Sequence, residues 1–107
     1  MVYTVRTLPR AELDAQRIYD WIRERSPDGA RRWWLAFDGA CSTLKHQPMS
    51  HALAPEAEWS DGDIRQLLFK TPRGNYYRLL YVVVEDEVRI LRVRGPGEPE
   101  LLADELP

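Results

Sequence analysis

Two runs rich in β-branched and aromatic residues, separated by a short acidic segment, constrain the fold of this chain more than any other feature. Residues 76–84 read YYRLLYVVV and residues 88–94 read VRILRVR, with Glu85, Asp86 and Glu87 between them. β-Branched and aromatic residues favour strands, and polar residues bound both runs, so the sequence predicts a β-hairpin. The strands also carry four arginines, namely Arg78, Arg89, Arg92 and Arg94. Because an arginine on a sheet face usually has an anionic partner, this hairpin is the first candidate for a binding surface.

The hairpin has two possible registers. A two-residue turn at Asp86 and Glu87 places Arg92 and Arg94 on a face with Tyr77, Leu79, Tyr81, Val83 and Ile90, and turns Arg89 toward the helices with Leu80, Val82, Val84, Leu91 and Val93. A three-residue turn instead groups Arg78 with Arg92 and Arg94, opposite a core side of Tyr77, Leu79, Tyr81, Val83, Leu91 and Val93. A slip of one residue exchanges the faces of one strand, and no Asn-Gly pair fixes the turn. Both registers place Arg92 and Arg94 together, and the plain alternative is that they are solvated arginines paired with acidic residues.

The first half of the chain predicts a strand followed by a helical hairpin. Residues 2–7 alternate as a strand does, and Pro9 suits the first turn of a helix over roughly 10–25. Ser26 is the expected N-cap of a second helix over roughly 27–46, with Pro27 at its first position and Pro48 ending it. The apolar stripes of the two helices have helical spacing and comprise Ala11, Ala15, Ile18 and Ile22, then Ala30, Trp33, Phe37, Ala40, Cys41 and Leu44. Helices joined by so short a turn should pack antiparallel.

The second half predicts three further strands in a meander. Residues 48–63 lack periodicity and indicate a long loop anchored by Trp59, after which Ile64–Lys70 form a strand that turns at 72–75 into the hairpin. The predicted order is therefore β-α-α-β-β-β. Helices segregated from a mainly antiparallel sheet define an α+β domain, here spanning residues 1–107.

Charge divides the chain unevenly. Residues 1–95 hold all 15 Lys and Arg against 13 Asp and Glu, for +2, whereas residues 96–107 hold four acidic residues and no basic one, for −4. We expect 96–107 to be an acidic, disordered terminus. A nearly neutral body gives weak support for nucleic-acid contact and suits a protein partner. No apolar run approaches the roughly 20 residues of a membrane span, and the N-terminus lacks the pattern of a signal peptide, so we expect a soluble cytoplasmic protein without membrane contact.

Catalytic and cofactor motifs are weak in this sequence. His46 and His51 lack a metal-ligand spacing, Cys41 is the only cysteine, and Gly95-Pro96-Gly97 is a poor phosphate loop because proline removes a backbone donor. We therefore expect no cofactor and no metal. Helical spacing assigns Trp33 to the core and leaves Trp34 as an exposed residue suited to a protein interface.

Several phrases in this order resemble the RelE/ParE toxins of bacterial type II toxin–antitoxin modules, a group that includes plasmid stabilisation proteins. The similarity covers roughly residues 3–95, and its most specific part is the Tyr-Arg-x-x-Tyr strand after an Ile-Arg strand. The phrases are Ile18-Tyr19-Asp20-Trp21-Ile22, Ser26-Pro27 with Ala30, Leu44 and Pro48, Ile64-Arg65, Tyr77-Arg78-Leu79-Leu80-Tyr81, and Val88 to Arg94. The resemblance implies a compact β-α-α-β-β-β fold. It also implies a cognate antitoxin whose C-terminal segment wraps around the toxin.

Two activities divide that family. RelE-like members are ribosome-dependent mRNA endonucleases that use no metal, and Arg78 matches an arginine that they use. A nuclease with a diverged site would here use Arg65, Lys70, Arg78 and Arg92. ParE-like members are not nucleases and poison DNA gyrase. This chain departs from the nuclease pattern after its last strand, because no tyrosine follows Tyr81 and no histidine follows His51. Phosphodiester cleavage needs acid/base groups as well as charge stabilisation, so the sequence favours the ParE-like branch, which acts by protein binding, over an enzyme.

The resemblance and the exposed aromatic positions together predict where an acidic, amphipathic antitoxin segment binds. The predicted contacts are Trp21, Trp34, Arg78, Tyr81, Arg92 and Arg94. DNA gyrase is the further partner expected, or the ribosome and mRNA if the nuclease hypothesis holds, with operator DNA reached only through the antitoxin. A third hypothesis is a toxin fold that has lost toxicity and serves in autorepression, with Glu98 to Glu105 folded back on the arginines.

Overall fold

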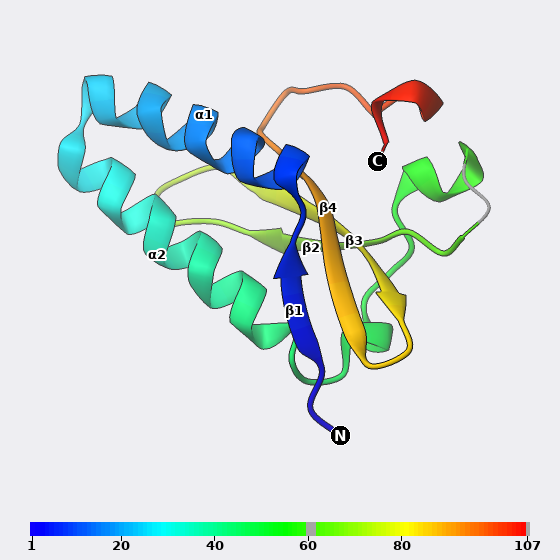
Figure 1. Ribbon diagram of the computed structural model, residues 1–107. Helices are drawn as coiled ribbons and strands as arrows, with labels where there is room; N and C mark the ends of the chain where they lie inside the picture. The colour runs from blue at the N-terminus through cyan, green and yellow to red at the C-terminus, as the bar shows by residue number, and fades with distance from the viewer. Residues whose placement is uncertain (60–61, 107) are drawn as a thin grey trace.

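The computed structural model describes residues 1–59 and 62–106, and it contains two helices and a four-stranded sheet (Figure 1). The side chain of Trp59, the predicted loop anchor, lies outside the described part of the chain. In chain order the elements are β1 (Thr4–Thr7), α1 (Pro9–Arg25), α2 (Pro27–Thr43), β2 (Arg65–Phe69), β3 (Tyr77–Val84) and β4 (Glu87–Arg94). Short 3-10 turns occupy Pro48–Ser50, Pro55–Trp59 and Ala103–Glu105. The predicted β-α-α-β-β-β order is confirmed.

The sheet is mixed, with strand order β1-β4-β3-β2. β2, β3 and β4 pair antiparallel, and β1 pairs parallel to β4, from Thr4 opposite Glu87 to Thr7 opposite Ile90. Figure 1 shows both helices on one side of this sheet, which is the segregation that defines an α+β fold. Because β1 is only four residues long, no strand of the described ranges lies beside the outer edge of β4 beyond Ile90.

Both helices begin as the sequence predicts. Pro9 occupies the first turn of α1, where its missing N–H costs nothing, and the Ser26 hydroxyl accepts the backbone N–H of Gly29 at 3.0 Å to cap α2. α2 ends at Thr43, three residues before its predicted end. Gln47 then takes a left-handed conformation (φ 50°) immediately before Pro48.

The β3–β4 hairpin has neither predicted register along its whole length. Val84 pairs with Glu87, so the turn is the two residues Glu85 and Asp86, and Glu85 adopts φ 58°. A β-bulge then shifts the register, because Tyr81 pairs with Ile90 whereas Leu80 pairs with Arg92. Beyond the bulge the pairing matches the three-residue-turn prediction, with Arg78 opposite Arg94. The extra residue, Leu91, packs on the arginine side of the sheet instead of the predicted core side.

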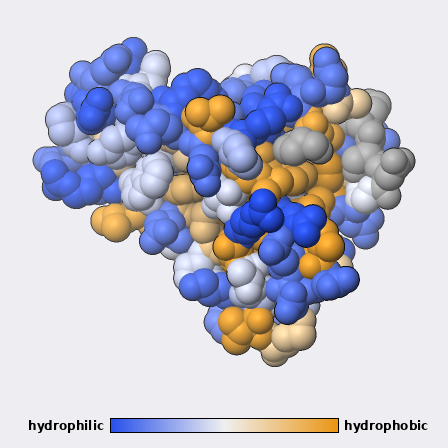
Figure 2. All heavy atoms as spheres, in the orientation of Figure 1, coloured by the Kyte–Doolittle hydropathy of each residue, from blue (hydrophilic) through white to orange (hydrophobic). Residues whose placement is uncertain are grey.

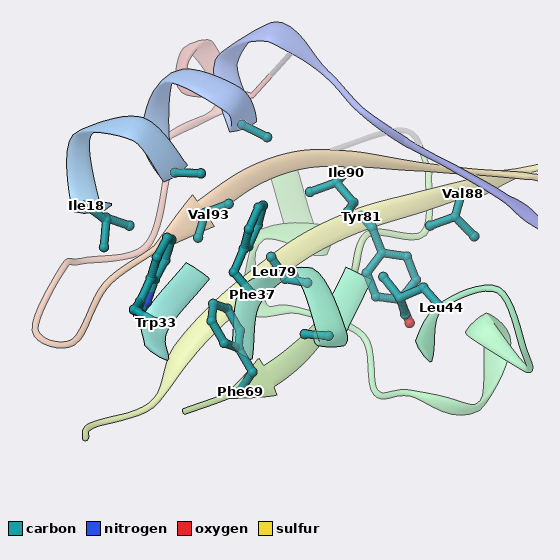
Figure 3. Close-up of a cluster of buried hydrophobic side chains, with 13 residues drawn as sticks. Ile18, Trp33, Phe37, Leu44, Phe69, Leu79, Tyr81, Val88, Ile90 and Val93 are labelled. Carbon is teal, nitrogen blue, oxygen red and sulfur yellow. The ribbon is translucent and has the colours of Figure 1, made fainter. Parts of the chain in front are cut away.

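Two hydrophobic cores lie on the two faces of the sheet. The larger core fills the space between helices and sheet, where Trp33 stacks on Phe37 with ring centroids 5.4 Å apart (Figure 3). The smaller core lies on the opposite face and joins Leu80 and Leu91 to Leu101. Leu101 is 0% exposed, which contradicts the prediction of a disordered terminus. In Figure 1 the segment after β4 runs back and ends beside the green 3-10 turn of residues 55–59.

Candidate functional site

The first arginine of the hairpin, Arg78, is held by a carboxylate from the middle of the chain. Its guanidinium donates to both oxygens of Glu56, at 2.9 and 2.8 Å, and to the amide oxygen of Gln66 at 3.0 Å. Glu56 is fully buried, and its Oε2 also accepts the backbone N–H of Leu101 at 3.1 Å. Burial alone raises the pKa of Glu56, but the hydrogen bonds from Arg78 and Leu101 outweigh it and hold that pKa below its ordinary value. Arg78 is therefore a neutralised charge whose donors are engaged within the chain.

Arg92 is held by a carboxylate from α1. Its Nε and Nη2 donate to the two oxygens of Asp14 at 2.7 and 3.0 Å, and its Nη1 donates to the backbone carbonyl of Glu105 at 2.7 Å. Asp14 also accepts the backbone N–H of Val93 at 2.9 Å. The hydrogen bonds from Arg92 to Asp14 raise the pKa of Arg92, and they outweigh the lowering that burial causes.

Arg94 is held by the segment that follows it. Its Nη1 lies 3.0 Å from Glu98 Oε2, and its Nη2 donates to the carbonyl of Pro99 at 2.8 Å. The other oxygen of Glu98 accepts the backbone N–H of Gly95 at 2.7 Å, and Arg17 of α1 lies 3.5 Å away. Arg94 is 7% exposed, so this ion pair is largely shielded from solvent.

Residues Arg78, Arg92 and Arg94 form what we call the arginine face. The chain's own residues 98–106 bond Arg92 and Arg94 directly, and they reach Arg78 only through Glu56, which accepts the Leu101 N–H. This placement agrees with the folded-back segment of the third hypothesis. No partner chain tests the predicted antitoxin contacts, which therefore remain predictions for these three residues. The structure adds that a partner could replace the bonds of Arg92 and Arg94 to residues 98–106 only if that segment moved, and those of Arg78 only by displacing Glu56.

Tyr81 is the predicted contact that lies deepest in the molecule. Its side chain is 0% exposed, and its hydroxyl donates to the carbonyl of Pro48 at 2.6 Å. Burial raises its pKa to about 12, so it carries no charge at neutral pH. In this conformation Tyr81 links β3 to the loop after α2 and offers nothing to a partner.

Trp21 and Trp34 are exposed, as a docking role requires, but they lie on separate grooves. Trp21 is 57% exposed, with the Arg25 guanidinium 3.7 Å from its ring centroid, and it borders a groove beside β3 and Gly95. Trp34 is 40% exposed and meets Tyr19 edge to face; it borders one groove toward β1 and another between the two helices. The helical hairpin is mostly hydrophilic on the face seen in Figure 2, whereas hydrophobic residues gather over the sheet.

The four residues of the nuclease hypothesis do not form one group of free charges. Arg65 begins β2 and Lys70 follows its last residue, a separation of roughly 17 Å at strand spacing. Arg65 donates to the carbonyl of His51 at 2.6 Å, and the Lys70 ammonium lies 5.2 Å from the Tyr76 ring centroid. Arg78 and Arg92 are each paired with a carboxylate, as described above.

Sequence reasoning missed the two carboxylates that organise the arginine face. Asp14 falls within the buried stripe of α1, three residues after Ala11 and four before Ile18, and an acidic residue at such a position is a usable signal. Glu56 lies in a segment without periodicity, so no sequence signal marks it. Among the described residues, no group of three or more His, Cys, Asp or Glu side chains could hold a metal ion. No helix in the described ranges is both long and apolar enough to cross a bilayer.

This chain matches a protein-family model and shares its fold with a solved structure. The family model described as the ParE toxin of type II toxin–antitoxin systems, parDE, matches residues 5–98. A solved structure described as the chromosomal ParDE toxin–antitoxin system from P. aeruginosa superposes with a TM-score of 0.68 at 20% sequence identity. It covers 87% of this chain and 95% of the other. No curated protein sequence matches.

Proposed function

Because the chain belongs to the family of ParE toxins of type II toxin–antitoxin systems, we propose that it is held inactive by a cognate antitoxin and acts by binding DNA gyrase. The observation that supports a binding role over a nuclease role is that the arginines are already paired with carboxylates. Arg78 and Arg92 each donate two hydrogen bonds to a carboxylate, so an RNA phosphate would have to displace a shielded ion pair from either one.

The helical hairpin is the surface we propose for the antitoxin. Trp21 and Trp34 present large aromatic areas to solvent, and exposed aromatic residues are typical anchors of protein interfaces. Arginines lie beside both, at Arg25 and Arg31, and these would attract an acidic segment. We expect alanine at either tryptophan to weaken antitoxin binding about tenfold or more, and Tyr76→Ala, which removes another exposed aromatic ring, to leave it unchanged.

Expression in bacteria tests the proposal. The chain is induced alone and together with the open reading frame that neighbours its gene, and growth, transcript ends and plasmid supercoiling are followed. Growth arrest that the neighbour relieves, with altered supercoiling and intact mRNA, supports a gyrase-directed toxin. Cleavage at codon positions in translated mRNA would support the ribonuclease instead.

The covered arginine face favours a second candidate, a family member that binds an antitoxin without being toxic. If residues 98–106 permanently occupy the surface that acts on the target, expression is harmless while antitoxin binding persists. Harmless expression at good protein levels, combined with nanomolar binding to the neighbour's product, would therefore select this candidate over the toxin.

A further inference from the structure

Three hollows lie next to one another where the β2–β3 turn approaches the helical hairpin. The middle hollow, of about 270 Å³, shares Arg32, Thr71 and Gly74 with its neighbour on the turn side. It shares Asn75, Tyr77 and Pro96 with its neighbour on the α1 side. We call these three adjoining hollows together the turn groove. It is separate from the arginine face, whose Arg78, Arg92 and Arg94 do not line it.

An unpaired buried donor lines the middle of the turn groove. Trp33 is 1% exposed, and its indole Nε1 finds no acceptor among the residues that the structure describes. The ring stacks on Phe37 at 5.4 Å and meets Tyr77 edge to face at 5.6 Å, so packing fixes the donor's direction (Figure 3). Buried N–H groups nearly always have a partner. The nitrogen is closed to solvent, so an acceptor bound in this hollow would reach it only if the side chains around it moved.

Two free positive charges border the same place. Arg32 comes from α2 and Arg73 from the β2–β3 turn; both are exposed, and neither forms an ion pair within residues 1–59 and 62–106. Glu98, at the far end of the groove, is already held by Arg94, Gly95 and Arg17. The turn end of the groove therefore carries a net positive charge with no internal counterion, which is the setting that recognises a carboxylate.

The α1 end of the groove is apolar, with Trp21, Ile18 and Pro96 along its wall. We propose that the turn groove binds an acidic, extended peptide segment of a partner protein. An Asp or Glu carboxylate lies between Arg32 and Arg73, a carbonyl accepts the Trp33 indole N–H, and a neighbouring apolar side chain lies against Trp21. The apolar end and Glu98 make a nucleic-acid strand a poorer occupant, since a phosphate backbone needs a run of cations. This inference depends on the residues that line the turn groove, and it holds whether or not the protein is toxic.

The proposal can be tested by NMR. The tryptophan indole N–H signals are followed in a proton–nitrogen correlation spectrum of the whole chain. The chain has four Trp, and Trp33→Phe identifies the signal of interest. The probe is a capped hexapeptide of alternating leucine and glutamate, compared with the same peptide carrying glutamine. We expect the glutamate peptide to move the Trp33 signal saturably and the glutamine peptide to bind about tenfold more weakly or worse.

Arg32→Gln and Arg73→Gln should each lower the affinity for the glutamate peptide about tenfold, because each removes one charged donor at an exposed position. Arg10→Gln is the matched control, an exposed helical arginine that lines none of the three hollows, and it should change nothing. A Trp33 signal that neither peptide moves would overturn the proposal, as would equal affinity for the two peptides. A stronger response to inorganic phosphate or to a single-stranded oligonucleotide would overturn the peptide assignment.

Discussion

Asp14 completes the sheet edge that β1 leaves open, by accepting the backbone N–H of Val93 at 2.9 Å. β1 pairs with β4 only as far as Ile90, and the chain then enters α1 at Pro9, which carries Asp14 along the continuing edge of β4. The same carboxylate holds Arg92 through two hydrogen bonds. One side chain therefore satisfies a strand donor and neutralises a shielded guanidinium.

Asp14→Ala should destabilise the fold by about 3–5 kcal/mol, because it leaves the Arg92 charge and the Val93 N–H without their partner. Urea unfolding followed by circular dichroism measures the change. Asp20→Ala is the matched control on the same helix, since the contacts of Asp20, an ion pair with Arg23 and a hydrogen bond from Gln16, are both exposed, and it should cost less than about 1 kcal/mol. Equal costs for the two variants would contradict the role assigned to Asp14.

Glu56 should make stability depend on acid pH. Its folded-state pKa lies below the ordinary value of 4.5, so its contribution is fully present above about that pH. The contribution is lost as the pH falls through the folded-state value. Comparing urea unfolding from pH 7 to pH 3 should show this loss in the natural chain and not in Glu56→Gln. Glu58→Gln, an exposed neighbour, should keep the natural pH profile, and a Glu56→Gln profile that matched it would refute the prediction.

Leu101 should contribute as much to the free energy of unfolding as an ordinary core residue, although it lies near the C-terminus. Leu101→Ala removes a fully buried side chain from the smaller core and should cost about 2–5 kcal/mol. Leu102 is 65% exposed, so Leu102→Ala should cost less than about 0.5 kcal/mol. Chemical denaturation of the two variants distinguishes a packed C-terminal segment from a loose one, in which both substitutions would be harmless.

Cys41 should react slowly with alkylating agents. Burial, with a smaller effect of the nearby Asp38 carboxylate, raises the pKa of its thiol from 9.0 to about 12. The thiolate is the reactive form, so its population at pH 8 falls about a thousandfold relative to the unperturbed thiol. Iodoacetamide labelling at pH 8, followed by mass spectrometry, should be slow in buffer and fast in denaturing urea. Equal rates in the two solutions would mean that the thiol is not shielded.

Secondary structure could be predicted from the sequence where apolar residues recur at a regular spacing, because that spacing marks the buried side of an element. The helical stripes containing Ala15 and Trp33 predicted the hairpin and its buried side, and Ser26-Pro27 located the start of α2. The β-branched runs predicted β3 and β4, and the resemblance to a toxin family agrees with the family match.

Features set by a single residue or by distant partners were not predictable. The bulge at Leu91 depends on how the hairpin packs against two cores at once, and no residue type marks it. The fold-back of residues 98–106 depends on Glu56, which lies more than forty residues away in a segment without periodicity. The unpaired Trp33 donor is likewise visible only once the surrounding side chains are in place.

The parallel pairing of β1 with β4 also has a consequence for the newly made chain. Thr4 lies opposite Glu87, a sequence separation of 83 residues (87 minus 4), and β4 is the only strand beside β1 in the described sheet. Such long-range closure is slow and cannot begin until both partners exist. A nascent chain that stops before residue 87 lacks the strand to which β1, β3 and the covering segment all attach. The assembled surfaces therefore arise only once residues 87–106 have been made, and products that terminate before them do not present these surfaces.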